Sequence, residues 1–100
     1  AAVIRVELPY HLRLLAGVDG EVCLELEGLP TIRAVLAELE LRFPALNGTI
    51  WDKASGQRRP FIRFFVCSQD WSHDRLDTEL PAQVRAGVEP LLIVGAVAGG

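Results

Sequence analysis

Apolar and polar residues alternate along two early stretches of the chain, "VIRVEL" (Val3–Leu8) and "VCLELE" (Val22–Glu27). An apolar side chain at every second position is typical of a β-strand with one buried face. Between the two stretches, Pro9 and the segment Gly17–Gly20 carry turn signals. The pattern therefore predicts a β-hairpin whose two strands are joined by a long loop.

A different spacing follows. Gly28-Leu29-Pro30 breaks the alternation, and Thr31 is suited to cap the N-terminus of a helix. A helix of about twelve residues is expected to end before Pro44, because the residue preceding a proline disfavours helical geometry. The predicted buried stripe consists of Ile32, Val35, Leu36, Leu39 and Phe43, and the predicted solvent side of Glu38, Glu40 and Arg42.

The second half of the chain predicts shorter elements. They are a loop over Asn47–Pro60, a strand in "FIRFFVC" (Phe61–Cys67), a turn at Ser68–Asp70, a short strand around Trp71–Arg75, irregular chain over Asp77–Glu89 and a last strand at Leu91–Val94. The whole order predicts an α+β fold, a mixed sheet of about five strands with one main helix packed on one face. We expect one domain over residues 1–95 and a flexible tail over residues 96–100.

One helix covers only one face of such a sheet, so the other face needs an explanation. If Leu91 and Ile93 point to the core, alternation places Leu92 and Val94 on the outer face. The strand before it would add further side chains to that face, namely Arg63 and Phe65. An exposed apolar patch usually marks a partner-binding surface, which predicts a docking face here. The alternative is that the Asn47–Pro60 loop covers the patch.

Composition narrows the classes of function. The chain has 100 residues, of which 50% are hydrophobic and 23% charged, with a net charge of -3. Nucleic-acid binding depends on a basic face, so we do not expect it. No apolar run approaches the roughly 18 residues of a membrane helix, so no membrane partner is expected. Cys23 and Cys67 form no disulfide or metal motif, which favours reduced thiols in a cytoplasmic protein.

Few residues are arranged for catalysis. His11 and His73 lack the neighbours of a metal site, and no nucleophile elbow accompanies Ser68, Asp70 and His73. Glu25 and Glu27 lie on one strand face and are interpreted as solvated charge. Arg58 and Arg59 are interpreted as part of a solvated loop, although they are also suited to binding an acidic partner. The sequence predicts no metal, no bound cofactor and no catalytic residue of its own.

The last ten residues, "LLIVGAVAGG", have a distinctive composition. A strand-like run is followed by glycine, alanine and valine alone. Glycine has no Cβ, so Gly99 and Gly100 allow the backbone to approach a ligand closely. Ala96, Val97 and Ala98 add little bulk and no charge. Such a tail is suited to threading a narrow channel in extended form, and we expect it to be exposed and mobile.

The element order and four stretches resemble the ubiquitin-like β-grasp sulfur carriers, the MoaD and ThiS family, particularly its CysO-like branch. The stretches are "TIRAVLAELELRFPAL" (Thr31–Leu46), "RPFIRFFV" with the "DW" that follows (Arg59–Trp71), "DTEL" (Asp77–Leu80) and "LLIVGAVAGG" (Leu91–Gly100). The chain departs from the pattern at Cys67, where the family often has asparagine, at Ala86–Glu89, where an acidic turn is common, and at Gly95, where the CysO-like branch often has proline.

The resemblance implies a reaction and partners. A ubiquitin-activating-type enzyme would adenylate the Gly100 carboxylate with ATP, and sulfur would displace AMP to leave a thiocarboxylate. A synthase would then accept the sulfur in molybdopterin, thiamine or cysteine biosynthesis, with this chain as a carrier or small subunit and not an enzyme. The resemblance also implies docking through the outer face.

Two other functions remain open at this stage. The same tail could acylate lysines on other proteins, as a ubiquitin-like modifier does, because both routes begin with adenylation. The chain could also be an interaction domain with an inert, accidental Gly-Gly end. Lys53 is the only lysine, which argues against chains built from copies of this protein.

Overall fold

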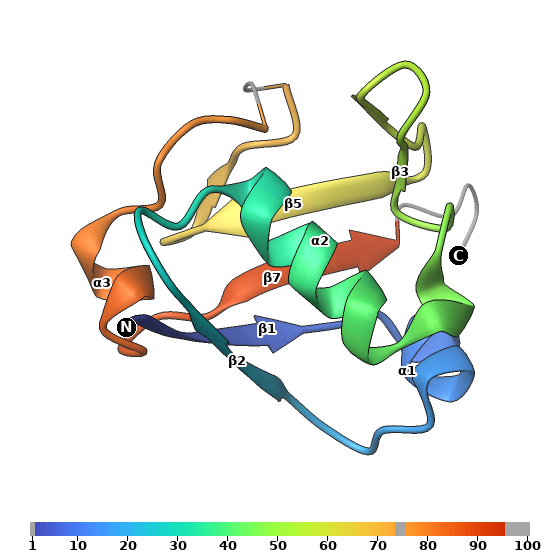
Figure 1. The fold of residues 1–100 in the computed structure, drawn as a ribbon, viewed down its shortest axis with the longest axis horizontal. Coiled ribbons are helices and arrows are strands. Elements are labelled where there is room, and N and C mark those ends of the chain that lie inside the picture. The colour runs from blue at the N-terminus through green and yellow to red at the C-terminus, as the bar shows by residue number, and fades with distance from the viewer. Residues whose placement is uncertain (1, 74–75, 96–100) are drawn as a thin grey trace.

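A computed structural model describes residues 2–73 and 76–95 of the chain (Figure 1). The strands are β1 (Ala2–Glu7), β2 (Val22–Leu26), β3 (Trp51–Asp52), β4 (Gln57–Arg58), β5 (Ile62–Val66), β6 (Gln69–Asp70) and β7 (Leu91–Gly95). The helices are α1 (Tyr10–Ala16), α2 (Ile32–Arg42), a 3₁₀ turn η1 (Pro44–Leu46) and α3 (Ala82–Arg85).

Five strands form one mixed sheet in the order β2-β1-β7-β5-β6. Strand β1 is antiparallel to β2 and parallel to β7, and β5 is antiparallel to both β7 and β6. The long helix α2 crosses one face of this sheet (Figure 1). The prediction of a mixed five-stranded sheet with one main covering helix is therefore confirmed.

The sequence features that predicted helix α2 are present in the structure. The Thr31 side chain accepts a hydrogen bond from the backbone N–H of Ala34 at 3.1 Å, so the predicted N-cap is present. The helix ends at Arg42, ahead of Pro44. Four residues of the predicted stripe are fully buried, namely Ile32, Val35, Leu36 and Leu39. The fifth, Phe43, is partly exposed and packs against the core.

Glu40 was predicted on the solvent side of α2, and this is wrong. Its side chain is only 2% exposed, and its Oε1 lies 3.1 Å from the Nζ of Lys53. Lys53 lies in the turn between β3 and β4. The helical pattern could not anticipate this burial, because the covering segment is distant in sequence.

The segment between Pro9 and Gly20 is not a plain loop. It contains α1, which begins after Pro9 and ends at Gly17 in the left-handed conformation (φ 72°) that glycine adopts without strain. Only Leu12 of the helix is fully buried. One buried position in seven residues leaves no periodic pattern, which explains why the sequence did not predict the helix.

The segment Asn47–Pro60 also differs from the predicted loop. It includes the β3–β4 hairpin, and two of its side chains, Ile50 and Trp51, are buried in the core. The ring of Trp51 lies under the guanidinium of Arg33, 5.2 Å from the ring centroid. This segment therefore packs against the α2 side of the molecule.

Three smaller boundaries are corrected in the second half. The turn after β5 is at Cys67 and Ser68, whose φ angles are 50° and 67°, and the short strand β6 follows at once. The predicted strand around Trp71–Arg75 is absent from its described part, 71–73. The stretch predicted as irregular contains α3, which buries Val84.

Candidate functional site

Four side chains that the sequence assigned to an outer face do share one face of the sheet. In the antiparallel pair β5–β7, Phe65 lies opposite Leu92 and Arg63 lies opposite Val94. Opposed residues in a sheet project to the same side, so the four side chains are cross-strand neighbours. Val94 is 40% exposed, and the other three are half-buried. The intervening residues of both strands face α2 and are buried.

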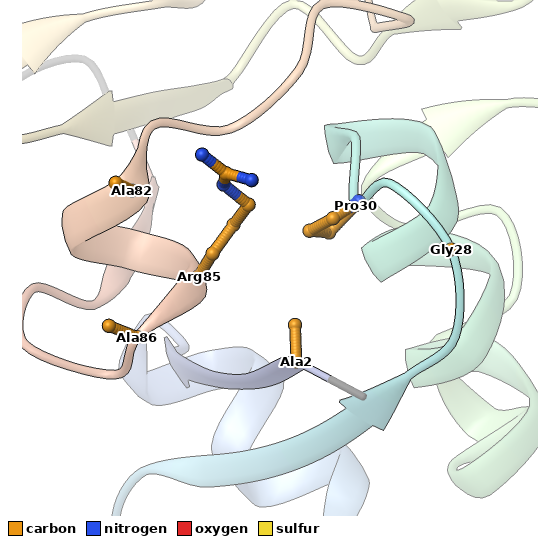
Figure 2. Close-up of a pocket in the computed structure, with 6 residues that line it drawn as sticks. All are labelled: Ala2, Gly28, Pro30, Ala82, Arg85 and Ala86. Atoms are coloured by element: carbon orange, nitrogen blue, oxygen red, sulfur yellow. The ribbon is translucent and has the colours of Figure 1, made fainter.

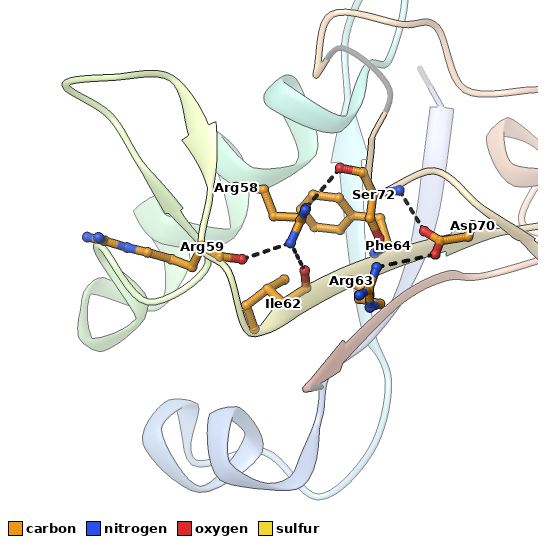
Figure 3. A network of polar contacts seen from close by, with 7 residues as sticks. All are labelled: Arg58, Arg59, Ile62, Arg63, Phe64, Asp70 and Ser72. Atoms are coloured by element: carbon orange, nitrogen blue, oxygen red, sulfur yellow. Dashed lines mark hydrogen bonds and ion pairs between the residues drawn. The ribbon is translucent and has the colours of Figure 1, made fainter. Parts of the chain in front are cut away.

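Charged groups border this patch, which we call the outer patch (Phe65, Leu92, Val94 and Arg63). Asp70 of β6 lies opposite Phe65, and its Oδ2 is 3.6 Å from Nη1 of Arg63 (Figure 3). Hydrogen bonds from the side chain and backbone of Ser72 lower the pKa of the Asp70 carboxyl, with Arg63 contributing less. Asp70 therefore keeps its charge to lower pH than an ordinary aspartate. The patch has an apolar centre and an ionised edge.

Arg58 holds neighbouring segments together through hydrogen bonds to backbone carbonyls. Its Nε donates to the carbonyl oxygen of Ser72 at 2.8 Å, and its Nη1 donates to that of Ile62 at 2.6 Å (Figure 3). The Ser72 hydroxyl in turn accepts from the N–H of Phe64 at 2.9 Å. Arg58 therefore ties the β4 segment to β5. Arg59 is exposed, with its Nε donating to the carbonyl of Gly48 at 2.8 Å.

The Asn47–Pro60 segment does not cover the outer patch. Trp51 and Lys53 of this segment contact α2, at Arg33 and Glu40. The hydrogen bonds that Arg58 makes with described residues go to backbone carbonyls and not to side chains of the patch. Helix α2 lies on the opposite face of the sheet (Figure 1). The alternative in which this segment shields the apolar residues is therefore wrong.

The end of β7 has a close contact that the sequence did not indicate. Gly95 pairs with Ile62, and a Cβ on Gly95 would lie 3.1 Å from Cε1 of His11 and 3.6 Å from Cβ of Pro9. A contact of 3.1 Å is tighter than ordinary van der Waals packing, so a side chain at position 95 would displace the imidazole. The contact depends on α1, which the sequence pattern did not predict.

Phe61 is a second residue that the sequence analysis did not assign to the site. It is 66% exposed and directly precedes Ile62, the partner of Gly95. It also stands two positions before Arg63, in step with the outer face. Continuing the alternation by one step toward the N-terminus would have identified it as a neighbour of the tail's origin.

The residues predicted to carry the chemistry lie outside the described part of the chain. These are the tail-threading residues Ala96, Val97 and Ala98 and the predicted reactive end, Gly99 and Gly100. The described chain leads to them through β7, which ends at Gly95 beside the N-terminus of α1 and the start of β5. Their exposure and mobility remain predictions.

The other candidate chemistry finds no assembled site. Within residues 2–73 and 76–95, no three histidine, cysteine or acidic side chains gather as a metal site would require. Asp70 is bonded to Ser72 and Arg63, and in this range no hydrogen bond joins it to Ser68 or His73. No helix in the same part of the chain is long and apolar enough to span a membrane.

Comparison with solved structures finds the same fold in several small proteins. Small archaeal modifier protein 1 from Methanosarcina acetivorans is 26% identical, with a TM-score of 0.73, and the match covers 99% of this chain and 97% of that protein. CysO from Mycobacterium tuberculosis is 25% identical, with a TM-score of 0.72 and coverage of 94% and 99%.

A third structure is the Amycolatopsis orientalis BexX/CysO complex, with 24% identity, a TM-score of 0.74 and coverage of 97% and 99%. No protein-family model and no curated protein sequence matches the chain. These similarities confirm the predicted ubiquitin-like β-grasp fold, and they include CysO, the branch that the sequence resembles.

Proposed function

We propose that this chain is a sulfur carrier whose Gly100 carboxylate is activated by a partner enzyme. The carboxylate oxygen attacks the α-phosphate of ATP and releases pyrophosphate, which leaves an acyl adenylate at the end of the tail. Sulfide then attacks the carbonyl carbon of the adenylate, displaces AMP and leaves a thiocarboxylate. That sulfur is passed to a precursor in cofactor or cysteine biosynthesis.

The observation that carries the proposal is the position of the outer patch. Its cross-strand pairs lie on β5 and β7, and β7 leads directly into the tail. A partner bound at Phe65, Leu92 and Val94 would therefore hold the origin of the tail within a few residues of its own active site. Apolar, partly exposed side chains with an ionised edge are typical of such an interface.

The comparisons support a protein partner of this kind. The solved CysO of Amycolatopsis orientalis is in complex with BexX, so a protein of this fold does assemble with another protein. We infer that this chain also binds a partner, and that the partner supplies ATP and the catalytic groups. The chain would act as the substrate.

A second candidate is protein modification, because three of the solved structures of this fold are of small archaeal modifier protein 1. Both functions begin with the same adenylate and separate afterwards. Intact-mass analysis of the protein, after incubation with its adenylating enzyme, ATP and sulfide, distinguishes them. A carrier gains the mass difference between sulfur and oxygen, whereas a modifier forms conjugates with lysine-containing proteins when cell extract replaces sulfide.

A matched control separates tail chemistry from side reactions. The chain lacking Gly99 and Gly100 should gain no sulfur and form no conjugate under the same conditions. If the intact chain also gains no sulfur and forms no conjugate with an enzyme that adenylates it, both functions are wrong.

A further inference from the structure

Arg85 differs from the other arginines that the structure describes. Each of the other seven makes a hydrogen bond or an ion pair: Arg5, Arg13, Arg33, Arg42, Arg58, Arg59 and Arg63. Arg85 has neither with any described residue, although its Nε is buried and its side chain is half-buried. A buried donor without an acceptor is unfavourable, and no residue in the described part of the chain supplies an acceptor for this one.

The guanidinium lies at a surface cavity of about 440 Å³. Figure 2 shows the Arg85 side chain extending from α3 into the space between that helix and the turn at Pro30. The residues that line the cavity are Ala2, Gly28, Pro30, Ala82, Arg85 and Ala86. Among these described residues, Arg85 is the only ionisable one. No described carboxylate of the lining opposes its positive charge, and the small side chains leave the space in front of it open.

We propose that this cavity is a binding site for a small oxyanion, a carboxylate or a phosphate group. The planar guanidinium carries a fixed positive charge and several N–H donors, which suits the oxygens of either group. The alanines and the proline would contact an apolar body attached to the anion.

The site is separate from the proposed carrier function. The cavity is at the start of β1, beside α3, whereas β7 ends at the opposite end of the sheet (Figure 1). A ligand bound here would not contact the outer patch or Gly95. The proposal can therefore fail while the carrier function holds, and the reverse is also true.

The test is an NMR titration of the full chain, labelled with ¹⁵N, with sodium phosphate and separately with sodium acetate. Sodium chloride at matched ionic strength is the reference for both. We expect the Nε–H signal of Arg85 and the amide signals of Ala82 and Ala86 to shift with saturation, at a dissociation constant of about 1 mM or tighter. Saturation by phosphate alone identifies a phosphate site, and saturation by acetate alone a carboxylate site.

Two variants make the test specific. Arg85→Gln should abolish the saturable shifts while the rest of the spectrum stays folded, and Arg85→Lys, which keeps the charge without the Nε donor, should weaken binding at least tenfold. Arg59→Gln is the matched control, because Arg59 is exposed and its Nε already donates to a carbonyl. No saturable shift with either anion, or shifts that persist in Arg85→Gln, would overturn the proposal.

Discussion

Phe64 and Phe65 are neighbours in β5, yet they belong to two different regions of the molecule. Phe64 faces α2 and is fully buried, whereas Phe65 is on the outer face, opposite Leu92, and is only half-buried. The inner face is a closed core, and the outer face keeps apolar surface in contact with solvent. The same two strands therefore hold the fold together on one side and leave apolar side chains partly exposed on the other, so substitutions can separate stability from the proposed binding.

The largest effect is expected on the inner face. Phe64→Ala should lower the free energy of unfolding by about 3–5 kcal/mol, because it removes a fully buried ring and leaves a cavity. Urea denaturation followed by circular dichroism measures the change. Phe65→Ala is the matched control on the outer face. If it lowers the free energy of unfolding as much as Phe64→Ala does, the proposed difference between the two faces is wrong.

A smaller effect is expected at the ion pair between Glu40 and Lys53. Lys53→Met should destabilise the fold by about 1–2 kcal/mol, because the 2%-exposed carboxylate of Glu40 loses its counter-charge. The loss is less than for a fully buried pair, since the lysine itself is 59% exposed and screened by water.

Glu40→Leu in the same background supplies the control. It removes the buried charge, so the double variant should recover most of the stability that Lys53→Met loses. Urea denaturation of the single and double variants provides the measurement. An unchanged unfolding midpoint for Lys53→Met would mean that the ion pair does not stabilise the core.

The sequence predicted the inner face better than the elements that frame it. The alternation of β1 and β2 and the stripe of α2 are periodic patterns, and both appear in the structure. Helix α1 and the burial of Glu40 depend instead on tertiary contacts between segments far apart in the chain. Such contacts leave no periodic trace, and propensity alone does not reveal them.

Substitutions on the outer face are expected to change the free energy of unfolding less than those described above. Val94→Glu should change the free energy of unfolding by about 0.5 kcal/mol or less, as is typical of exposed positions, while weakening binding to the adenylating enzyme. Phe65→Glu should likewise fold and bind weakly. Isothermal titration calorimetry measures the binding, and melting curves measure the stability.

Leu41→Glu is the matched control for this pair. Leu41 is an apolar residue of α2 with 77% exposure, on the opposite side of the sheet from the outer patch. The Leu41→Glu variant should bind the adenylating enzyme with the same affinity as the unaltered chain. Equal loss of binding in all three variants would mean that added negative charge, and not the outer patch, weakens the complex.

The smallest effect is expected at an exposed ion pair between β1 and the segment before β2. Hydrogen bonding from Arg5, at 2.7 Å, lowers the pKa of the Glu21 carboxyl below its ordinary value of 4.5. Because the folded-state pKa is the lower one, this contribution to stability is present above about pH 5 and is lost as the pH falls through the lowered pKa.

Arg5→Gln should raise the pKa of Glu21 toward its ordinary value and remove that part of the acid dependence. A ¹³C NMR titration of the Glu21 carboxyl carbon measures the pKa directly. Arg59→Gln is the matched control, because Arg59 is exposed and donates to the carbonyl of Gly48, and it should leave the pKa of Glu21 lowered. If the Glu21 pKa is unchanged in Arg5→Gln, the ion pair is not the cause of its shift.

The candidate site was predictable in part. Strand alternation correctly placed Arg63, Phe65, Leu92 and Val94 on one face, because register and facing follow from a period of two. The contact of Gly95 with His11 was not predictable, since it requires α1 to fold against the end of β7. Arg58 was interpreted as loop charge, and its half-buried hydrogen bonds to backbone carbonyls could be recognised only in three dimensions.

The most direct test of the carrier function is ATP–pyrophosphate exchange catalysed by the adenylating enzyme of the same cell. Deleting Gly99 and Gly100 retracts the carboxylate by about 7 Å, and a displacement of even about 1 Å can reduce a rate about a hundredfold. We predict that exchange is abolished for the shortened chain. Its free energy of unfolding, obtained from melting curves, should stay within about 0.5 kcal/mol of that of the full chain. Undiminished exchange with the shortened chain would contradict the account and would leave an interaction domain with an inert tail.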